Sequence, residues 1–186
     1  MRAAQTSLEG VLLLEPAVHG DERGFFVETY RASVWGELGV DATFVQDNHS
    51  RSRRGTLRGM HFQTHPGQAK LVRCARGAIY DVAVDLRRGS PTFGRWEGHE
   101  LDDAGLRQLW VPVGFAHGFC VLSEIADVTY KCSSYYDPAT EGGIAYDDPD
   151  VGIAWPDVDL LVSERDRTAP RLAEVADRLP FVKPPA

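Results

Sequence analysis

Short runs of strand-forming residues recur along most of the chain, with glycine- or proline-containing turns between them. A spacing of roughly 8–12 residues between such runs is typical of an all-β sandwich or barrel. The stretch 31–38 could form one short helix that Gly39 ends, and helical spacing of apolar residues is confined to the tail, where we expect a helix over 171–180. We expect turns at 21–24 and 76–77, the second hairpin-like, and strands at 11–14, 25–30, 44–49, 56–63, 70–75, 78–86, 96–101, 107–111, 118–122 and 128–133.

The run 78–86 indicates a strand that is buried on both sides. Successive side chains of a strand point to opposite faces, and here both faces are largely apolar. Asp81 lies on one of these faces, so it would be an inward carboxylate that needs a partner. The alternative is that Asp81 lies at the open end of a barrel and is solvated.

Length and charge restrict the possible classes of protein. The 186 residues suffice for one domain with a substantial core, and no linker or repeat divides them, so we expect a single domain over 1–186. The formal net charge of −7 provides no general field for nucleic acid. Arg51, Arg53 and Arg54 form a basic cluster that fits either a solvated turn or local phosphate binding, whereas Arg58 lies within a predicted strand.

Cysteine usage and the N-terminus argue for an ordinary intracellular protein. Cys74, Cys120 and Cys132 are odd in number and lie in apolar runs, which is typical of buried free thiols. The apolar run 11–14 is too short for a signal peptide or a membrane span. We therefore expect a cytoplasmic protein without membrane contact.

The stretch 46–70 concentrates groups that can perform chemistry. On the predicted strand 56–63, His61 and Gln63 share a face with Gly59, which leaves space beside the imidazole. An imidazole titrates close to neutral pH and can act as a general base. Lys70 begins the next strand, and if the two strands pair, its ammonium could face the same cavity and stabilise an oxyanion. The alternatives are a structural histidine and an exposed lysine.

The segment 110–119 has the pattern P-x-G-x-x-H, which resembles the second sequence motif of the cupin superfamily of β-barrels. In metal-binding cupins, the histidine of that motif, here His117, joins an H-x-H pair and a glutamate from the first motif. Gln63 stands in place of the second histidine, and no glutamate follows at a suitable distance. We therefore expect no metal site.

Tyr130 and the segment 163–166 are further candidates with competing interpretations. A tyrosine on a barrel strand is usually a core or rim residue, but a phenol in the cavity could donate a proton to a carbanion. From spacing alone, Ser163-Glu-Arg-Asp166 predicts a helix cap with solvated charges.

Eight ordered segments together resemble the dTDP-4-dehydrorhamnose 3,5-epimerases and related nucleotide-sugar epimerases over nearly the full length. They are D-E-R-G-F-F at 21–26, F-V-Q-D-N-H-S-R-S at 44–52, G-T-L-R-G-M-H-F-Q at 55–63, Q-A-K-L-V-R-C at 68–74, G-S-P-T-F-G-R-W at 89–96, V-P-V-G-F-A-H-G-F at 111–119, Y-K-C-S-S-Y-Y-D-P at 130–138 and S-E-R-D at 163–166. The resemblance implies a metal-free cupin barrel, a double-stranded β-helix, that forms a homodimer by exchanging an N-terminal strand. It also implies a nucleotide-linked 4-keto-6-deoxy sugar as substrate, and no cofactor.

The same resemblance implies roles for individual residues. His61 is then the base that removes a proton next to the C4 ketone, and Asp166 orients it, which replaces the interpretation as a solvated cap. Lys70 stabilises the enolate oxygen, and Tyr130 returns a proton on the opposite face. Residues expected to contact nucleotide or sugar, some across the dimer, are Arg23, Glu28, Gln46, Asn48, Arg58, Asp81, His117, Tyr136, Glu141 and Arg165.

Several alternatives remain at this level. An enzyme that inverts only C3 or only C5, or that uses another nucleotide, would share these residues. A non-catalytic sugar-binding cupin would be expected to lack the base, the lysine or the tyrosine. A metal-dependent cupin would need a metal-ligating histidine at the position where this chain has Gln63.

Arg58 and His61 have opposite parity on an ideal strand, so both reach one site only if Gly59 bends or bulges the strand.

Overall fold

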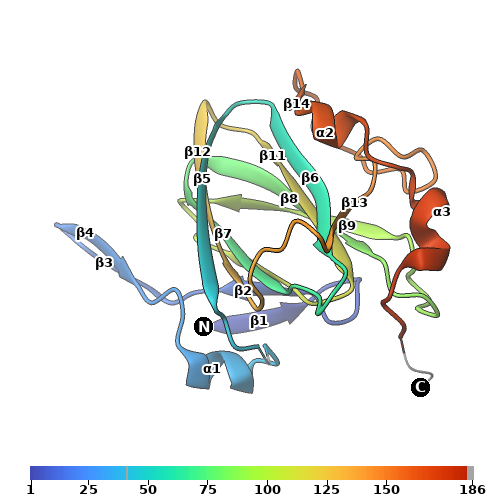
Figure 1. Ribbon diagram of the computed structural model, residues 1–186. Helices are drawn as coiled ribbons and strands as arrows, with labels where there is room; N and C mark the ends of the chain where they lie inside the picture. Colours follow the sequence, from blue (N-terminus) through green and yellow to red (C-terminus); the bar gives the residue numbers. More distant parts are fainter. Residues whose placement is uncertain (41, 184–186) are drawn as a thin grey trace.

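The computed structural model describes residues 1–40 and 42–183, so position 41 and positions 184–186 of the predicted domain lie outside the described residues. Most of the strands form two sheets, which face each other around a barrel (Figure 1). Sheet I has the order β1 (Arg2–Gln5), β2 (Leu12–Glu15), β10 (Gln108–Val111), β7 (Lys70–Arg76), β12 (Ile125–Cys132) and β5 (Gln46–Arg53). Sheet II has the order β13 (Glu141–Gly143), β6 (Thr56–Gln63), β11 (Phe115–Val121), β8 (Ala78–Asp85) and β9 (Trp96–Asp102), and β14 (Leu161–Val162) pairs with β6. The all-β jelly-roll prediction is confirmed.

Apolar side chains fill the barrel and also cover the outer face of each sheet. Val72, Ile79 and Phe119 belong to a cluster between the two sheets. Outside sheet II, Val82 and Val84 pack in a cluster with residues of the C-terminal segment. The prediction that β8 is buried on both faces is therefore confirmed, and so is the burial of the three free cysteines.

The helices are short and peripheral. α1 (Ala32–Glu37) confirms the prediction at 31–38, and its Trp35 is buried against sheet I. The predicted helix 171–180 is only partly correct, since α3 (Leu172–Val175) continues as the 3₁₀ turn η1 (Ala176–Arg178). Pro180 ends it, because proline lacks the backbone donor that helix continuation requires. No helix within residues 1–40 and 42–183 is both long and apolar enough to cross a bilayer.

The predicted hairpin at 76–77 is wrong. β7 belongs to sheet I, whereas β8 belongs to sheet II and pairs with β9 and β11. Gly77 has a positive φ of 79°, which suits a sharp corner as well as a hairpin. Turn residues therefore predicted a change of direction, but not the sheet to which the next strand would belong.

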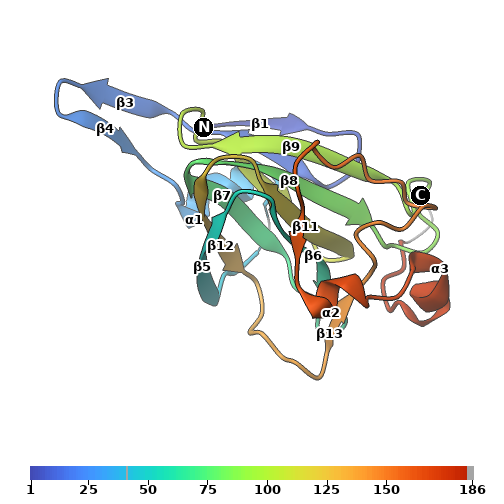
Figure 2. The same cartoon turned by 90° about the horizontal axis from the view of Figure 1, so that it is seen from above.

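A two-stranded arm projects away from the barrel (Figures 1 and 2). It consists of β3 (Val18–Asp21) and β4 (Gly24–Val27), which pair only with each other. The predicted turn 21–24 is confirmed, whereas the predicted strand 25–30 is shorter. Phe25 and Phe26 on the arm are 60% and 70% exposed, which is unusual for adjacent aromatic side chains.

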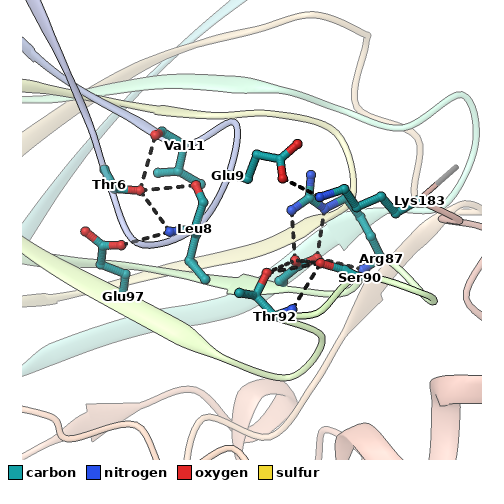
Figure 3. Close-up of polar contacts among 10 residues, drawn as sticks. Thr6, Leu8, Glu9, Val11, Arg87, Ser90, Thr92, Glu97 and Lys183 are labelled. Atoms are coloured by element: carbon teal, nitrogen blue, oxygen red, sulfur yellow. Dashed lines mark hydrogen bonds and ion pairs between the residues drawn. The ribbon is translucent and has the colours of Figure 1, made fainter. Parts of the chain in front are cut away.

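A buried carboxylate braces the barrel beside the turn between β1 and β2. Arg87, Ser90 and Thr92 converge on one carboxylate (Figure 3), that of the fully buried Asp85. Burial alone would raise the pKa of Asp85, but these hydrogen bonds outweigh it and lower the pKa. The carboxylate therefore stays ionised and holds the segment that follows β8.

A bulge in β6 positions the inward side chains of that strand. His117 of β11 faces His61, but Phe119 faces Arg58, so one residue more is present on β6 than on its partner. Gly59 lies in this bulge with a φ of 141°. A Cβ atom on Gly59 would lie 2.5 Å from the Cα atom of Gly118. The predicted bulge at Gly59 is therefore confirmed, and with it Arg58 and His61 can reach the same side of the strand.

We expect Gly59→Ala to lower the free energy of unfolding by about 1–3 kcal/mol, because a side chain is strained at this φ and collides with backbone. Urea unfolding measures the change. Gly36→Ala in α1 is the matched control, since a Cβ atom there meets no other atom within 4 Å. The control should gain about 0.5–1 kcal/mol from helix propensity. An unchanged midpoint for Gly59→Ala would contradict the role of the bulge.

Candidate functional site

A cavity of about 380 Å³ opens between the sheets where β5, β7 and β12 face β6 and β13. Its walls therefore come from both sheets. Seven of the predicted site residues line it: Gln46, Asn48, His61, Lys70, Tyr130, Tyr136 and Glu141.

His61 and Asp166 form a close pair at this cavity. The Nε2 atom of His61 lies 2.7 Å from Oδ1 of Asp166. Asp166 belongs to α2 (Glu164–Arg167), where its backbone N–H donates to the N-cap Ser163 as the spacing predicted. The interpretation of solvated charges is wrong for Asp166, which is only 5% exposed. Burial would raise the pKa of Asp166, but its interactions with His61, the backbone N–H of Gly59 and Ser163 together outweigh burial and lower the pKa.

Lys70 and Tyr130 face the cavity from sheet I. The condition that the strands of His61 and Lys70 pair is not met, because β6 and β7 lie in opposite sheets. Lys70 is directly opposite Cys132 and Tyr130 is opposite Val72, so Lys70 and Tyr130 are diagonal neighbours on one face. Burial lowers the pKa of the Lys70 ammonium and raises the pKa of the Tyr130 phenol.

The arrangement supplies different chemistry from its two walls. The imidazole on sheet II has an ionised carboxylate behind it and can accept a proton. The phenol on sheet I keeps its proton at neutral pH and can donate it. A molecule held between the walls can therefore lose a proton to one side and gain one from the other, next to an ammonium that stabilises negative charge.

Three predicted residues form a clasp at the rim of the cavity. Arg165 Nη2 lies 2.8 Å from Glu141 Oε2, and the Tyr136 hydroxyl donates to the same oxygen at 2.7 Å. Burial would raise the pKa of Glu141, but Arg165 and Tyr136 outweigh it and lower the pKa. Gln46 accepts a hydrogen bond from the backbone of Tyr136 at 2.9 Å. The clasp thus joins β5, β13 and α2.

Further predicted residues lie deeper or beside the cavity. His117 Nε2 is 2.5 Å from Oδ1 of Asp81, and both side chains are buried, so the solvated alternative for Asp81 is wrong. Arg58 donates from Nε to the Ser52 hydroxyl at 3.1 Å. Ser52 was not predicted, although Gln46, Asn48, Ser50 and Ser52 alternate along one strand. That alternation was the signal for a polar inward face.

Two predicted residues do not reach this cavity within the chain. Arg23 lies on the projecting arm, where its guanidinium pairs with Asp21. Glu28 follows the arm and pairs with Arg31. The interpretation of the basic cluster at 51–54 as a turn is only partly correct. Arg54 lies in the turn that follows β5, whereas Arg51 and Arg53 belong to β5, and Arg51 Nε lies 2.7 Å from Asp127 Oδ1.

The described residues contain no group of three His, Cys, Asp or Glu side chains that could hold a metal ion. Gln63, at the position where metal-binding cupins have a histidine, is 4% exposed and accepts a hydrogen bond from Thr140 at 2.6 Å. The amide oxygen of Gln63 therefore forms a structural contact with Thr140.

Comparison with known proteins identifies close relatives. The family model described as dTDP-4-dehydrorhamnose 3,5-epimerase matches residues 5–174. The dTDP-4-dehydrorhamnose 3,5-epimerase of Methanothermobacter thermautotrophicus is 50% identical over 176 residues, which cover 93% of this chain and 95% of the relative.

Solved structures agree with the sequence match. The dTDP-6-deoxy-D-glucose-3,5-epimerase of Legionella pneumophila, in complex with dTDP-4-keto-L-rhamnose, superposes with a TM-score of 0.95 at 46% identity, covering 98% of this chain and 99% of that chain. A 3'-monoepimerase of Streptomyces bikiniensis, in complex with dTDP-quinovose, has a TM-score of 0.90 at 41% identity, covering 98% and 93%.

We expect Lys70→Met to unfold at the same urea concentration as the wild type or at a higher one, with a gain of up to about 1 kcal/mol. The reason is that the buried ammonium loses hydration, which lowers its pKa. At a pH between the lowered pKa of Lys70 in the folded protein and its ordinary pKa in the unfolded chain, the unfolded state binds more protons than the folded state. The stability of the wild type therefore rises with pH in this range. The advantage of Lys70→Met should therefore shrink as the pH approaches the ordinary lysine value of 10.5.

Lys131→Met is the matched control for this prediction. Lys131 points outward from the neighbouring strand and pairs with Asp47 on the surface. Its replacement should change stability by less than about 0.5 kcal/mol at neutral pH. A Lys70→Met variant that is clearly less stable than this control would show that the buried ammonium stabilises the fold.

Proposed function

The chain belongs to the dTDP-4-dehydrorhamnose 3,5-epimerase family, and from that premise we propose that it is an isomerase that converts dTDP-4-dehydro-6-deoxy-D-glucose to dTDP-4-dehydro-L-rhamnose. The observation that carries the proposal is the two-sided cavity. The His61–Asp166 pair lies on one wall, and Lys70 and Tyr130 lie on the other.

Each inversion takes two proton transfers. His61 removes the proton from the carbon next to the C4 ketone, and the electron pair of the broken C–H bond moves into an enolate. Asp166 orients the imidazole and stabilises the imidazolium that forms. Lys70 stabilises the enolate oxygen. Tyr130 then donates a proton to the same carbon from the opposite face. No electrons leave the sugar, so the reaction needs no redox cofactor.

The remaining predicted residues bind the substrate in this proposal. Arg58 and Arg165 can contact phosphate oxygens through forked guanidinium hydrogen bonds. The other residues of the proposed binding set within the chain are Gln46, Asn48, Asp81, His117, Tyr136 and Glu141.

The enzyme acts as a homodimer in this proposal, with the arm as the exchanged element. In the structure, β1 pairs with β2 of the same chain, whereas β3 and β4 pair only with each other. A two-stranded ribbon is marginally stable alone, and the exposed Phe25 and Phe26 need cover. A second copy supplies it, and the arm then delivers Arg23 and Glu28 to the partner's cavity.

A second candidate function is inversion at C3 alone. It is supported by the TM-score of 0.90 with the 3'-monoepimerase. Such an enzyme uses the same base and acid, so the choice depends on which carbon reaches His61.

We expect the protein, incubated in deuterated water with dTDP-4-dehydro-6-deoxy-D-glucose, to introduce deuterium at C3 and at C5, as followed by proton NMR. His61→Asn should slow exchange at both carbons about 100- to 10,000-fold, the range for loss of a general base. Tyr130→Phe should still exchange deuterium through His61 but yield little inverted sugar. Exchange at C3 alone supports the second candidate, and no exchange at either carbon refutes both.

We expect two inactive variants to restore each other if the arm acts in the partner subunit. Arg23→Ala and His61→Asn are co-expressed with different tags, and the mixed dimer is assayed by the same exchange. Only one of its two cavities combines a native His61 with a native Arg23, so a random mixture should recover about a quarter of the wild-type sites. No recovery in a purified mixed dimer would place the arm's action within its own subunit.

A further inference from the structure

A hydrogen bond between the two sheets holds the side chain of Arg58. Its Nε atom, on β6 of sheet II, donates to the hydroxyl of Ser52, on β5 of sheet I, at 3.1 Å. Ser52 is only 6% exposed, whereas Arg58 extends to the surface. Burial raises the pKa of Tyr130, and the positive charge of Arg58 opposes that rise, so the guanidinium lies near the cavity.

The guanidinium of Arg58 keeps its terminal donors available. Arg51, Arg87 and Arg165 each pair with an aspartate or a glutamate. In the part of the chain that the structure describes, Arg58 forms no ion pair, and its one side-chain hydrogen bond is that to Ser52. Both terminal NH₂ groups therefore remain for an anion from outside the chain, and their forked geometry suits phosphate oxygens.

Two serines on the inward face of β5 differ in what their hydroxyls bind. Ser52 lies opposite Ala126, and Ser50 lies opposite Val128. Ala126 and Val128 both belong to the apolar cluster between the sheets, so the two serines have similar surroundings. Yet Ser52 accepts the hydrogen bond from Arg58, whereas Ser50 Oγ has no hydrogen-bond partner among the described residues. The pair separates the effect of holding Arg58 from the effect of an inward hydroxyl.

We propose that Ser52 is a positioning residue of the proposed epimerase: its hydroxyl holds Arg58 through Nε, so that both terminal NH₂ groups are directed at the diphosphate of the nucleotide-linked sugar. The inference rests on the proposed function for the identity of the anion. A free arginine side chain loses rotamer entropy when it binds a ligand, and a hydrogen bond that already orders it reduces this loss. Ser52 therefore acts on substrate affinity and not on the proton transfers.

The test compares Ser52→Ala, which removes the acceptor, with Ser52→Thr, which keeps a hydroxyl. Ser50→Ala is the matched control, because it removes an unpartnered hydroxyl from the same face of the same strand. Ser52→Ala is also made in an Arg58→Met background. Calorimetric titration with dTDP gives the Kd of the nucleotide, deuterium exchange at the sugar gives kcat and KM, and urea unfolding shows that each variant is folded.

We expect Ser52→Ala to raise the Kd for dTDP and the KM about three- to tenfold, the range for one net hydrogen bond, with kcat nearly unchanged. Ser52→Thr should retain most of the wild-type affinity, and Ser50→Ala should bind dTDP as the wild type does. In the Arg58→Met background, Ser52→Ala should cause no further loss of affinity, because the hydroxyl acts through the guanidinium.

The inference is overturned if folded Ser52→Ala binds dTDP as tightly as the wild type, or if it weakens binding equally with and without Arg58. It is also overturned if Ser50→Ala causes the same loss, because any inward hydroxyl would then suffice. If the wild type binds dTDP but exchanges no deuterium, the proposed function fails alone, and the titrations still decide whether Ser52 acts through Arg58. A wild type that does not bind dTDP refutes both.

Discussion

Apolar side chains of sheets I and II pack against each other and exclude water from most of the barrel, so each polar group inside depends on a partner from the protein. This constraint accounts for the pairing of Asp166 with His61 and of Asp81 with His117. It also accounts for the pKa changes, since burial penalises the charged forms of Lys70 and Tyr130, and hydrogen bonds reverse that penalty for Asp166. The chemistry of the cavity follows from where water is excluded.

The same packing gives the cavity two unlike walls. Because consecutive strands β6, β7 and β8 alternate between the sheets, residues close in sequence face each other across the barrel. His61 and Lys70 therefore face the cavity from different sides, which a shared sheet would not allow. The bulge at Gly59 adds Arg58 to the inward side of β6, at a point where backbone approaches backbone and only glycine fits.

The arm differs from the barrel, because it leaves large apolar side chains exposed. Its strands bury little and expose Phe25 and Phe26, so its conformation has few contacts with its own barrel. Such a segment gains stability only from a further surface. The proposed dimer supplies that surface and accounts for the position of Arg23 and Glu28, which lie away from the cavity of their own chain.

The sequence by itself determined the all-β class, the span of β6, the helix at 31–38 and the types of the site residues, because period-two alternation, turn chemistry and motif spacing are local properties. It did not predict β1, β3, β13 or β14, which are short and weakly patterned. Tertiary structure alone decided that β6 and β7 lie in opposite sheets, that Asp166 is buried against His61, and that His99 lies opposite Asp81. These contacts join residues far apart in the chain, and they depend on which strands pair, which turn residues do not encode.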